Sequence, residues 1–369
     1  MAWLFDICKN SFYEQVTHSP EQMIKTIFLL FVWGGLFLSS AHAQVKKFPQ
    51  IWIASTPVLD YSTLFIHPES WMFALQRVEV IEITPFFVRL AGANGLENVL
   101  HFVQSHHLKL ALAGAILTPG PNDCGDGVEA YSPPGFMLSI AQRIQSLGGK
   151  IDLIAMDEPY HFGHIATTFW RPNHGLCQDS ISDVAHNAAQ TIAAIHTVFP
   201  NVSVGDIEPI PNLAENAPEG KAEIAQLADW AQAFSQATGK PLAFIHFDVI
   251  WNSKSPKMEP TAAKKGWTTA LLQAVTVARS LNLPYGIIIN GIPRANSNLE
   301  WTETAEQHYK IIEGRLGLKP DDLIFQTWTK FPNRVGPETT PGTLTNLLAG
   351  YVQWHEMQDS RPTSSPSSH

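Results

Sequence analysis

The amino-acid sequence predicts an α/β fold, a single (β/α)8 TIM barrel preceded by a signal peptide. Two observations lead to the barrel: eight short apolar segments rich in branched residues recur along the chain, and segments with helical period lie between most of them. The competing fold is a doubly wound open sheet. That fold normally has a glycine-rich turn after its first strand, and the segment after residue 54 has none.

The expected strands are apolar runs bounded by polar or turn residues, which is the usual signal for a buried strand. The run from 77 to 84 shows β-branched alternation, and the run from 151 to 156 is apolar on both faces, as in parallel sheets. The expected strands cover residues 50–55, 77–84, 108–117, 151–156, 201–208, 241–250, 285–290 and 322–328.

The expected helices follow the strands in order and are marked by period and by glycines at their ends. Gly148 and Gly149 end one helix and Gly239 closes another, because glycine is favoured just past a helix C-terminus. The region between the first two strands is poorly marked. The expected helices cover residues 96–106, 136–147, 180–198, 221–238, 261–281, 301–316 and 343–354. We find no internal repeat and no linker, so we expect one barrel domain over residues 46–356.

Composition limits the possible functions. Hydrophobic residues make up 45% of the chain and charged residues only 15%, which is enough apolar material for a large core. The net charge is −9 and no Lys/Arg cluster occurs, so we expect no nucleic-acid partner, since phosphate binding needs a basic face. We expect a monomer.

The N-terminus has the three parts of a secretory signal: Lys25, an apolar run over 27–38, and the small-residue site Ala41-His42-Ala43. We expect residues 1–43 to be a leader cleaved after Ala43, with translation starting at Met23. An uncleaved anchor is the alternative, but the apolar run is shorter than the ~18 residues that a spanning helix needs. The mature chain is then secreted or periplasmic, without stable membrane insertion. Residues 357–369 are expected to form a disordered tail.

Cleavage removes Cys8 and leaves Cys124 and Cys177 in the mature chain. An even pair in an oxidising compartment predicts one disulfide, with two free thiols as the alternative. The two cysteines lie in the loops after the third and fourth strands, so a disulfide would connect two walls of a cleft.

Polar residues follow each apolar run, and the carboxyl ends of parallel strands are where barrels place their active sites. Side chains alternate along a strand, so Asp206 with Glu208, and His246 with Asp248, each share a face and are expected to point toward the barrel axis. The full set of strand-end residues is Asp157, Glu158, Asp206, Glu208, His246, Asp248, Asn290, Gln326 and Trp328.

Carboxylates gathered in a concave site raise the pKa of at least one of them, because burial and like-charge repulsion favour the neutral form. A protonated acid beside an ionised one is the equipment of glycoside hydrolysis. The alternative is structural: acids at strand ends also cap helices or hold loops.

The segment Met156-Asp157-Glu158-Pro159, with the strand–helix alternation, resembles the TIM-barrel glycoside hydrolases. A large retaining group in that superfamily has Asn-Glu-Pro at the end of strand four and uses its Glu as acid/base, which corresponds to Glu158. This chain departs from that group at two places. Asp157 replaces the Asn, and strand seven ends in Asn290 where that group has a nucleophilic Glu.

The adjacent acids also resemble the substrate-assisted hexosaminidases, in which the Asp orients the acetamido group of the sugar and the Glu is the general acid. That resemblance implies roles for Asp157 and Glu158 and needs no enzyme nucleophile. Glu208 and Asp248 remain available as an ordinary second carboxylate. A retaining pair stands ~5 Å apart and an inverting pair ~6.5 to 9.5 Å apart, and the sequence leaves this choice open.

Aromatic residues at or beyond strand ends can stack on a sugar ring or pack in the core. Trp328 is the strongest candidate, followed by Tyr160, Trp170 and Trp251. His161, His164 and His174 match no standard zinc spacing, and the nucleotide, metallopeptidase and serine-hydrolase motifs are absent, so we expect no cofactor and no metal. The sequence thus predicts an exported glycosidase acting on a polysaccharide or oligosaccharide. The alternatives are a non-catalytic carbohydrate-binding barrel and a metal-assisted hydrolase.

Overall fold

The computed structural model describes residues 48–54, 61–167, 175–210, 218–249, 251 and 267–359. The predicted leader, Trp170, His174 and residues 360–369 of the predicted tail lie outside these ranges. The chain divides into two compact units, Met1–Phe48 and Pro49–His369. The fold described below is that of the second unit.

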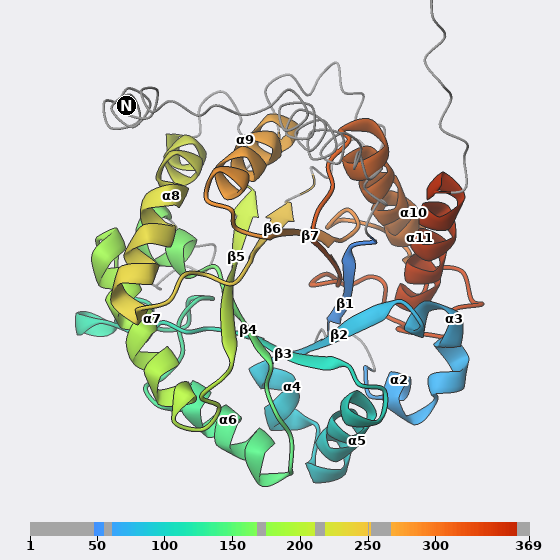
Figure 1. The fold of residues 1–369 in the computed structure, drawn as a ribbon, viewed down its shortest axis with the longest axis horizontal. Coiled ribbons are helices and arrows are strands. Elements are labelled where there is room, and N and C mark those ends of the chain that lie inside the picture. Colours follow the sequence, from blue (N-terminus) through green and yellow to red (C-terminus); the bar gives the residue numbers. More distant parts are fainter. Residues whose placement is uncertain are drawn as a thin grey trace, which may run out of the picture. The chain divides into compact units, whose positions relative to one another are not determined.

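Eight parallel strands form a closed barrel in chain order, and β1 pairs with both β2 and β8 (Figure 1). This confirms the predicted (β/α)8 fold and excludes the open sheet. The last strand ends at Phe325, so Gln326 and Trp328 follow it rather than belonging to it. The strands are β1 (Gln50–Ala54), β2 (Val78–Ile83), β3 (Lys109–Gly114), β4 (Leu153–Asp157), β5 (Ser203–Ile210), β6 (Ile245–Val249), β7 (Tyr285–Ile289) and β8 (Asp322–Phe325).

Helices surround the barrel between successive strands (Figure 1). The poorly marked region between β1 and β2 consists of short pieces: α2 (Thr63–Ile66), a 3₁₀ turn at Pro68–Trp71 and α3 (Met72–Leu75). The other helices are α4 (Pro85–Leu90), α5 (Ala93–Ser105), α6 (Phe136–Ser146), α7 (Ile181–His196), α8 (Pro218–Thr238), α9 (Trp267–Ser280), α10 (Asn298–Tyr309) and α11 (Leu344–Asp359). Since α11 continues to Asp359, the predicted tail begins too early at residue 357.

Side-chain hydroxyls cap several helices at their N-termini. Thr84 accepts a hydrogen bond from the Phe87 N–H, Ser180 from the Asp183 N–H and Ser297 from the Glu300 N–H. Each cap satisfies one of the free N–H groups of the first turn, which is typically worth about 1 kcal/mol. These caps fix where the chain leaves a strand-end loop and enters a helix.

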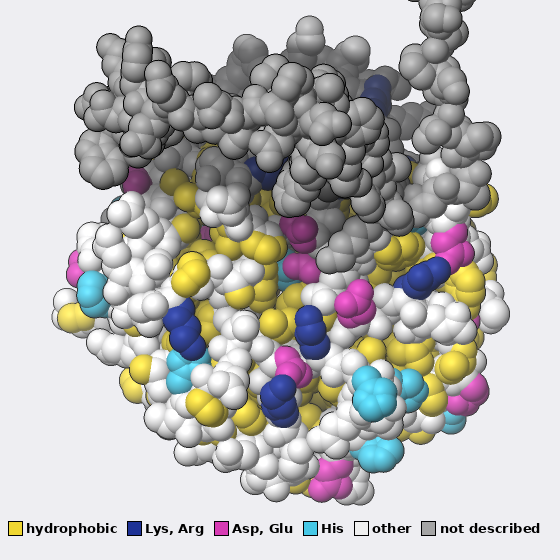
Figure 2. Space-filling model, viewed as in Figure 1, with side chains coloured by type: hydrophobic (Ala, Val, Ile, Leu, Met, Phe, Trp, Pro, Cys, Tyr) yellow, Lys and Arg dark blue, Asp and Glu magenta, His cyan; other side chains and the backbone are white. Residues whose placement is uncertain are grey.

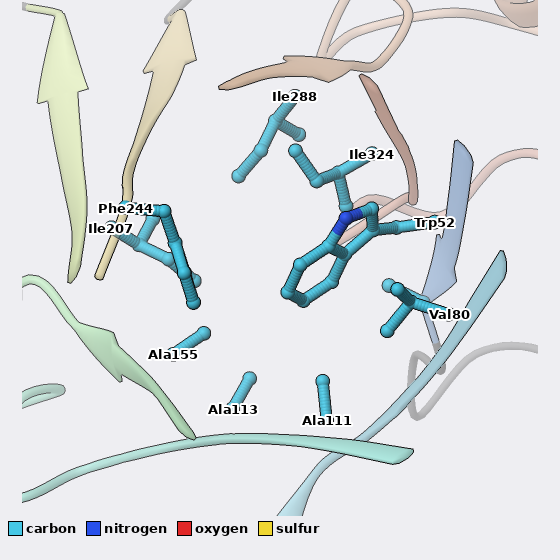
Figure 3. Packing of buried hydrophobic residues seen from close by; sticks show 10 residues of the cluster. Trp52, Val80, Ala111, Ala113, Ala155, Ile207, Phe244, Ile288 and Ile324 are labelled. Carbon is cyan, nitrogen blue, oxygen red and sulfur yellow. The ribbon is translucent and has the colours of Figure 1, made fainter. Parts of the chain in front are cut away.

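The barrel interior is filled by side chains that alternate along the strands (Figure 3). Trp52 and Phe244 are the largest, and their rings meet edge to face at 5.3 Å. Small side chains such as Ala111, Ala113 and Ala155 lie across from them, so large and small residues together fill the barrel interior. The interior cluster is Trp52, Ala54, Val80, Ala111, Ala113, Ala155, Ile207, Phe244, Ile288 and Ile324.

This alternation determines which strand-end residues reach the barrel mouth. Two residues beyond an interior residue, the next side chain again points inward. Ala155 therefore leads to Asp157 on β4, and Ile288 leads to Asn290 after β7. On β5 the interior residue is Ile207, so its neighbours in sequence point outward, toward the helices.

Candidate functional site

The end of β4 carries a backbone turn at Glu158, whose φ of 51° lies in the left-handed region. A non-glycine residue pays roughly 1–2 kcal/mol for this conformation, so the surrounding contacts must hold it. The Glu158 N–H donates to the Ile207 carbonyl at 3.0 Å, and the Glu158 carbonyl accepts from the Phe162 N–H at 3.0 Å. In an extended strand the Asp157 and Glu158 side chains would point to opposite faces. Because the backbone turns at Glu158, that alternation does not continue to this residue.

Both carboxyls at the end of β4 are only partly exposed. Burial is the main cause that raises the pKa of Asp157 well above its usual range, and the Glu129, Glu82, Asp248 and Asp206 charges add to it. Burial likewise raises the pKa of Glu158 well above its usual range, and the Glu129 and Asp157 charges are the next largest causes. A neutral carboxylic acid at neutral pH is the form that can donate a proton.

Asp248 on β6 is the third carboxyl of this mouth group, defined as Asp157, Glu158 and Asp248. Its Oδ1 accepts a hydrogen bond from Asn290 Nδ2 at 3.0 Å, and Trp328 is a second hydrogen-bond partner. Burial raises the pKa of Asp248 to about 7, while both hydrogen bonds oppose the rise. A carboxyl that is half ionised near neutral pH suits a general base.

Asn290 is held in place from behind by a histidine. His308 Nδ1 lies 2.7 Å from the Asn290 carbonyl oxygen, and burial lowers the pKa of His308 to about 3. Because the imidazole is neutral and a carbonyl only accepts, Nδ1 carries the hydrogen and donates it. His308 thereby positions the backbone of the residue that binds Asp248.

The sequence did not single out two further acids near the mouth group. Glu82 on β2 lies two residues beyond Val80 of the interior cluster and is buried. Glu82 could have been identified from the sequence, because it is an acid within a run of β-branched residues. Glu129, in the loop after β3, is exposed, and among the surrounding charges it contributes most to the raised pKa of both Asp157 and Glu158. Nothing in its local sequence distinguishes it.

Asp206 and Glu208 share a face of β5, as predicted, but that face is the outer one and not the face toward the barrel axis. Asp206 is fully buried and its Oδ2 accepts from Trp230 Nε1 of α8 at 2.6 Å. The Glu208 carboxylate accepts from the N–H groups of Tyr160 and His161, at 2.9 and 3.0 Å. The expectation was wrong because Ile207 occupies the inner face of β5.

These two acids form an outer group with Glu223 of α8, between β5 and the loop after β4. Glu223 is buried, and its Oε1 lies 3.0 Å from His161 Nδ1. Burial raises the pKa of Glu208, and the Asp206, Glu223 and Glu158 charges add to this. Both Glu208 oxygens accept hydrogen bonds from backbone N–H groups of the turn that follows Glu158. Glu208 therefore has a structural role: it holds this turn.

Tyr160 does not present an open face to the mouth. The side chain is fully buried, its ring stacks on Trp230 with centroids 5.8 Å apart, and its hydroxyl donates to the Glu223 carbonyl at 2.9 Å. The prediction of a sugar-binding role for Tyr160 is therefore replaced by a packing role beneath the outer group.

His246 points inward as predicted, but it lies below the mouth and inside the barrel. It is fully buried, with Nε2 3.2 Å from Asp322 Oδ2, and its ring meets Trp52 edge to face at 4.7 Å. Trp52 Nε1 also donates to Asp322, at 3.2 Å. Because Asp322 is the first residue of β8, this polar cluster belongs to the opposite end of the barrel from Asp248.

Of the remaining predicted sugar-binding residues, Trp251 is 3% exposed and its ring stacks on His308 at 3.2 Å, so that face is covered. Trp328 is 46% exposed beside Asp248 and keeps an open ring face. Gln326 is half-buried and its N–H donates to the Ile289 carbonyl. Trp328 and Gln326 thus lie at the barrel mouth, where sequence placed them.

The predicted disulfide between Cys124 and Cys177 is present, with Cα atoms 5.0 Å apart. It joins the loop after β3 to the loop after β4. The Gly125 N–H donates to the Gly175 carbonyl at 2.7 Å next to it, so the connection is supported by the backbone. The loop that carries Glu129 is therefore tied to the loop that follows Glu158.

The described residues contain no group of three or more His, Cys, Asp or Glu side chains that could hold a metal ion. His164, one of the three histidines considered in the sequence, contacts the Asp179 carbonyl at 2.6 Å and Gln226 at 3.3 Å. In the same residues no helix is long and apolar enough to cross a membrane.

No family model and no curated protein matches this chain. Similar solved structures include a psychrophilic glycoside hydrolase family 10 endo-β-1,4-xylanase, 12% identical over 82% of this chain and 96% of that one, with a TM-score of 0.48. Xylanase XynB from Paenibacillus barcinonensis is 15% identical over 80% and 88% of the two chains, with a TM-score of 0.45. A phospho-2-dehydro-3-deoxyheptonate aldolase from Thermotoga maritima is 10% identical over 84% and 68%, with a TM-score of 0.44. These likenesses are of fold alone, and they include members of the TIM-barrel glycoside hydrolases that the sequence resembles.

Proposed function

We propose that this protein is an exported glycoside hydrolase that acts on a polysaccharide or oligosaccharide, with Glu158 as the general acid and Asp248 as the general base. The observation that carries the proposal is the mouth group: three partly exposed carboxyls at the ends of β4 and β6, with the pKa of each raised by burial. Figure 2 shows acidic side chains next to one another near the centre of this face.

The two roles follow from the two environments. Glu158 has several acids around it and a pKa raised well above its usual range, which favours the neutral form that protonates a leaving oxygen. Asp248 has two hydrogen-bond donors, Asn290 and Trp328, which favour its ionised form. Glycoside hydrolysis needs one carboxyl of each kind.

Strand order supports an inverting mechanism. Asp248 on β6 is separated from β4 by β5, and adjacent strands run about 4.8 Å apart, so the two carboxyls start from backbones roughly twice that distance apart. An inverting pair stands ~6.5 to 9.5 Å apart, with room for a water molecule, whereas a retaining pair stands ~5 Å apart. The water activated by Asp248 would attack the sugar carbon from the face opposite Glu158.

The remaining parts of the mouth have roles that match this chemistry. Trp328 offers an open ring face beside Asp248 for stacking on a sugar, and Asp157 lies next to Glu158 for contact with a sugar substituent. The Cys124–Cys177 disulfide suits the oxidising compartment of an exported protein.

The test separates the two roles by leaving group. A panel of polysaccharides, and of aryl glycosides with the dinitrophenolate leaving group, is assayed with the wild type, Glu158→Ala and Asp248→Asn. Glu158→Ala should lose about 10²–10⁴-fold in kcat on polysaccharide but keep most activity on the aryl glycoside, whose leaving group needs no proton. Asp248→Asn should lose activity on both.

The matched control is Glu303→Gln, which alters an exposed carboxylate of α10 and should leave both activities unchanged. Unaltered polysaccharide hydrolysis in Glu158→Ala would contradict the assignment of the acid. A wild type that binds saccharides without cleaving any would indicate the carbohydrate-binding alternative, and activity lost on chelation would indicate the metal-assisted one.

A further inference from the structure

Glu82 is a buried acid for which the proposed acid–base chemistry has no use. It lies on the inner face of β2, two residues beyond Val80, and is 2% exposed. Its register partners on the neighbouring strands are Ala54 and Ala111. The side chain therefore stands on top of the apolar interior, at the floor of the mouth.

One oxygen of this acid has no hydrogen bond. Glu82 Oε2 is buried and finds no partner in the part of the chain that the structure describes. A buried polar atom without a partner costs about 1–3 kcal/mol, and a Val or Ile at this position would continue the interior pattern without that cost. Keeping a destabilising group at the floor of a site is typical of residues that serve function rather than stability.

The charge of Glu82 raises the pKa of two neighbouring groups, Tyr61 and Asp157, after burial as the main cause in each. The Tyr61 hydroxyl donates to the Ile53 carbonyl at 2.7 Å, so its proton is already used. Burial raises the pKa of Glu82 to about 8, so at neutral pH the carboxyl is neutral and has an O–H to donate. The charges of Glu129, Asp248 and Asp206, as well as that of Glu82, add to the raised pKa of Asp157.

The interior side chains on the strands next to Glu82 and Asp157 are small. The residues on β3 and β4 that face the interior beside them are Ala113 and Ala155, and Figure 3 shows both as short stubs across from Trp52. A ligand hydroxyl placed there can accept from one carboxyl and donate to the other, which satisfies both.

Resting on the proposed function, we propose that Glu82 is a substrate-recognition residue: it donates a hydrogen bond to a hydroxyl of the saccharide at the barrel mouth, and that hydroxyl donates to Asp157. Above pH 8 Glu82 loses its proton, both carboxyls become acceptors, and a single hydroxyl can satisfy only one of them. The saccharide then loses one hydrogen bond.

The test is calorimetric binding of oligosaccharides in a Glu158→Gln background, which keeps the sugar intact. It compares that background alone with the same background carrying Glu82→Gln, Glu82→Ala or, as the matched control, Glu79→Gln. Glu79 is exposed on the same strand and accepts from Gln50 Nε2 at 3.0 Å. At pH 6, Glu82→Gln should bind within about twofold of the parent, and Glu82→Ala should bind about tenfold more weakly, the size of one hydrogen bond.

Between pH 6 and 9.5 the affinity of the parent relative to Glu82→Gln should fall about tenfold, because the Gln amide donates at every pH. Thermal unfolding of Glu82→Ala should show no loss of stability. A structural role for Glu82 would instead lower the unfolding temperature of this variant. Equal binding by parent and Glu82→Ala, or a parent-to-Gln affinity ratio that does not change with pH, would overturn the proposal.

The outcomes separate this proposal from the proposed function. Saccharide binding that depends on Glu82 without any hydrolysis by the wild type would support the role of Glu82 and contradict the glycosidase. Hydrolysis by the wild type together with saccharide binding that is insensitive to Glu82 would support the glycosidase and contradict the role of Glu82. Absence of saccharide binding by every variant and by the wild type would overturn both.

Discussion

The mouth group and the outer group contain the same residue types, yet they have different surroundings. Asp157, Glu158 and Asp248 are partly exposed at the open end of the barrel. Asp206, Glu208 and Glu223 are buried. Trp230 donates to Asp206, backbone N–H groups donate to Glu208, and His161 Nδ1 contacts Glu223. The comparison shows that the face on which a strand-end acid lies determines whether it reaches the barrel mouth or packs against a helix.

The largest expected effect comes from comparing one acid of the mouth group, Asp248, with one acid of the outer group, Asp206. Asp248→Asn should lower kcat by about 10²–10⁴-fold, because it removes the proposed general base. In the wild type, kcat/KM should rise with pH as Asp248 ionises near pH 7 and fall again as Glu158 loses its proton. Asp248→Asn should lose the rising limb, as measured by pH–rate profiles on a soluble substrate.

Asp206→Asn is the comparison variant and should keep the shape of the pH–rate profile. Its effect should be on stability. Burial raises the pKa of Asp206 to about 8, so the folded wild type loses stability as pH rises from about 4, the usual pKa of an unfolded Asp, to about 8. Urea unfolding across that range should show a smaller pH dependence in Asp206→Asn. If Asp206→Asn also lost the rising limb of the pH–rate profile, the distinction between the mouth group and the outer group would be contradicted.

The next effect is that of Glu208→Gln, which keeps one acceptor oxygen and turns an NH₂ toward the second backbone donor. One of the two bonds to Tyr160 and His161 is lost, and we expect about 1–3 kcal/mol less unfolding free energy. Because the turn after Glu158 loosens, kcat should fall while KM changes little. The pH–rate profile should keep both limbs, whereas a catalytic role for Glu208 would remove one.

The smallest expected effect is that of Trp328→Ala, which removes an exposed ring from the mouth. Losing one aromatic stacking contact costs about 0.5–1.5 kcal/mol, so KM should rise roughly two- to tenfold with unfolding free energy unchanged. Trp251→Ala is the contrast, since that ring is buried against His308 and its removal should lower stability by about 3–5 kcal/mol. Michaelis kinetics and urea unfolding measure both.

The sequence predicted the barrel because apolar period and strand–helix alternation are local signals, and all eight strands are present. It placed Asp157, Glu158, Asp248 and Asn290 at the mouth for the same reason. It predicted the wrong inner face for β5, because Val204, Ile207 and Ile210 make both faces apolar and the residue pattern does not distinguish them. That choice depends on packing against Phe244 and Trp230, far away in the sequence.

Other features depended on backbone geometry that no residue pattern encodes. The left-handed turn at Glu158 follows from its bonds to Ile207 and Phe162. His246 shares a face with Asp248, but its place below the mouth depends on where β8 begins, since Asp322 is its partner. The loop that carries Glu129 is held by the Cys124–Cys177 disulfide and by the bridge between Leu117 and Tyr131, which join residues far apart in the sequence.

The anomeric configuration of the first product tests the central claim, that Glu158 and Asp248 act as acid and base from strands β4 and β6. Proton NMR can follow the anomeric signals during the first minutes of hydrolysis, before mutarotation mixes them. We expect a product whose configuration is inverted relative to the substrate, because the pair leaves room for an attacking water. A product with retained configuration would contradict this assignment of Asp248.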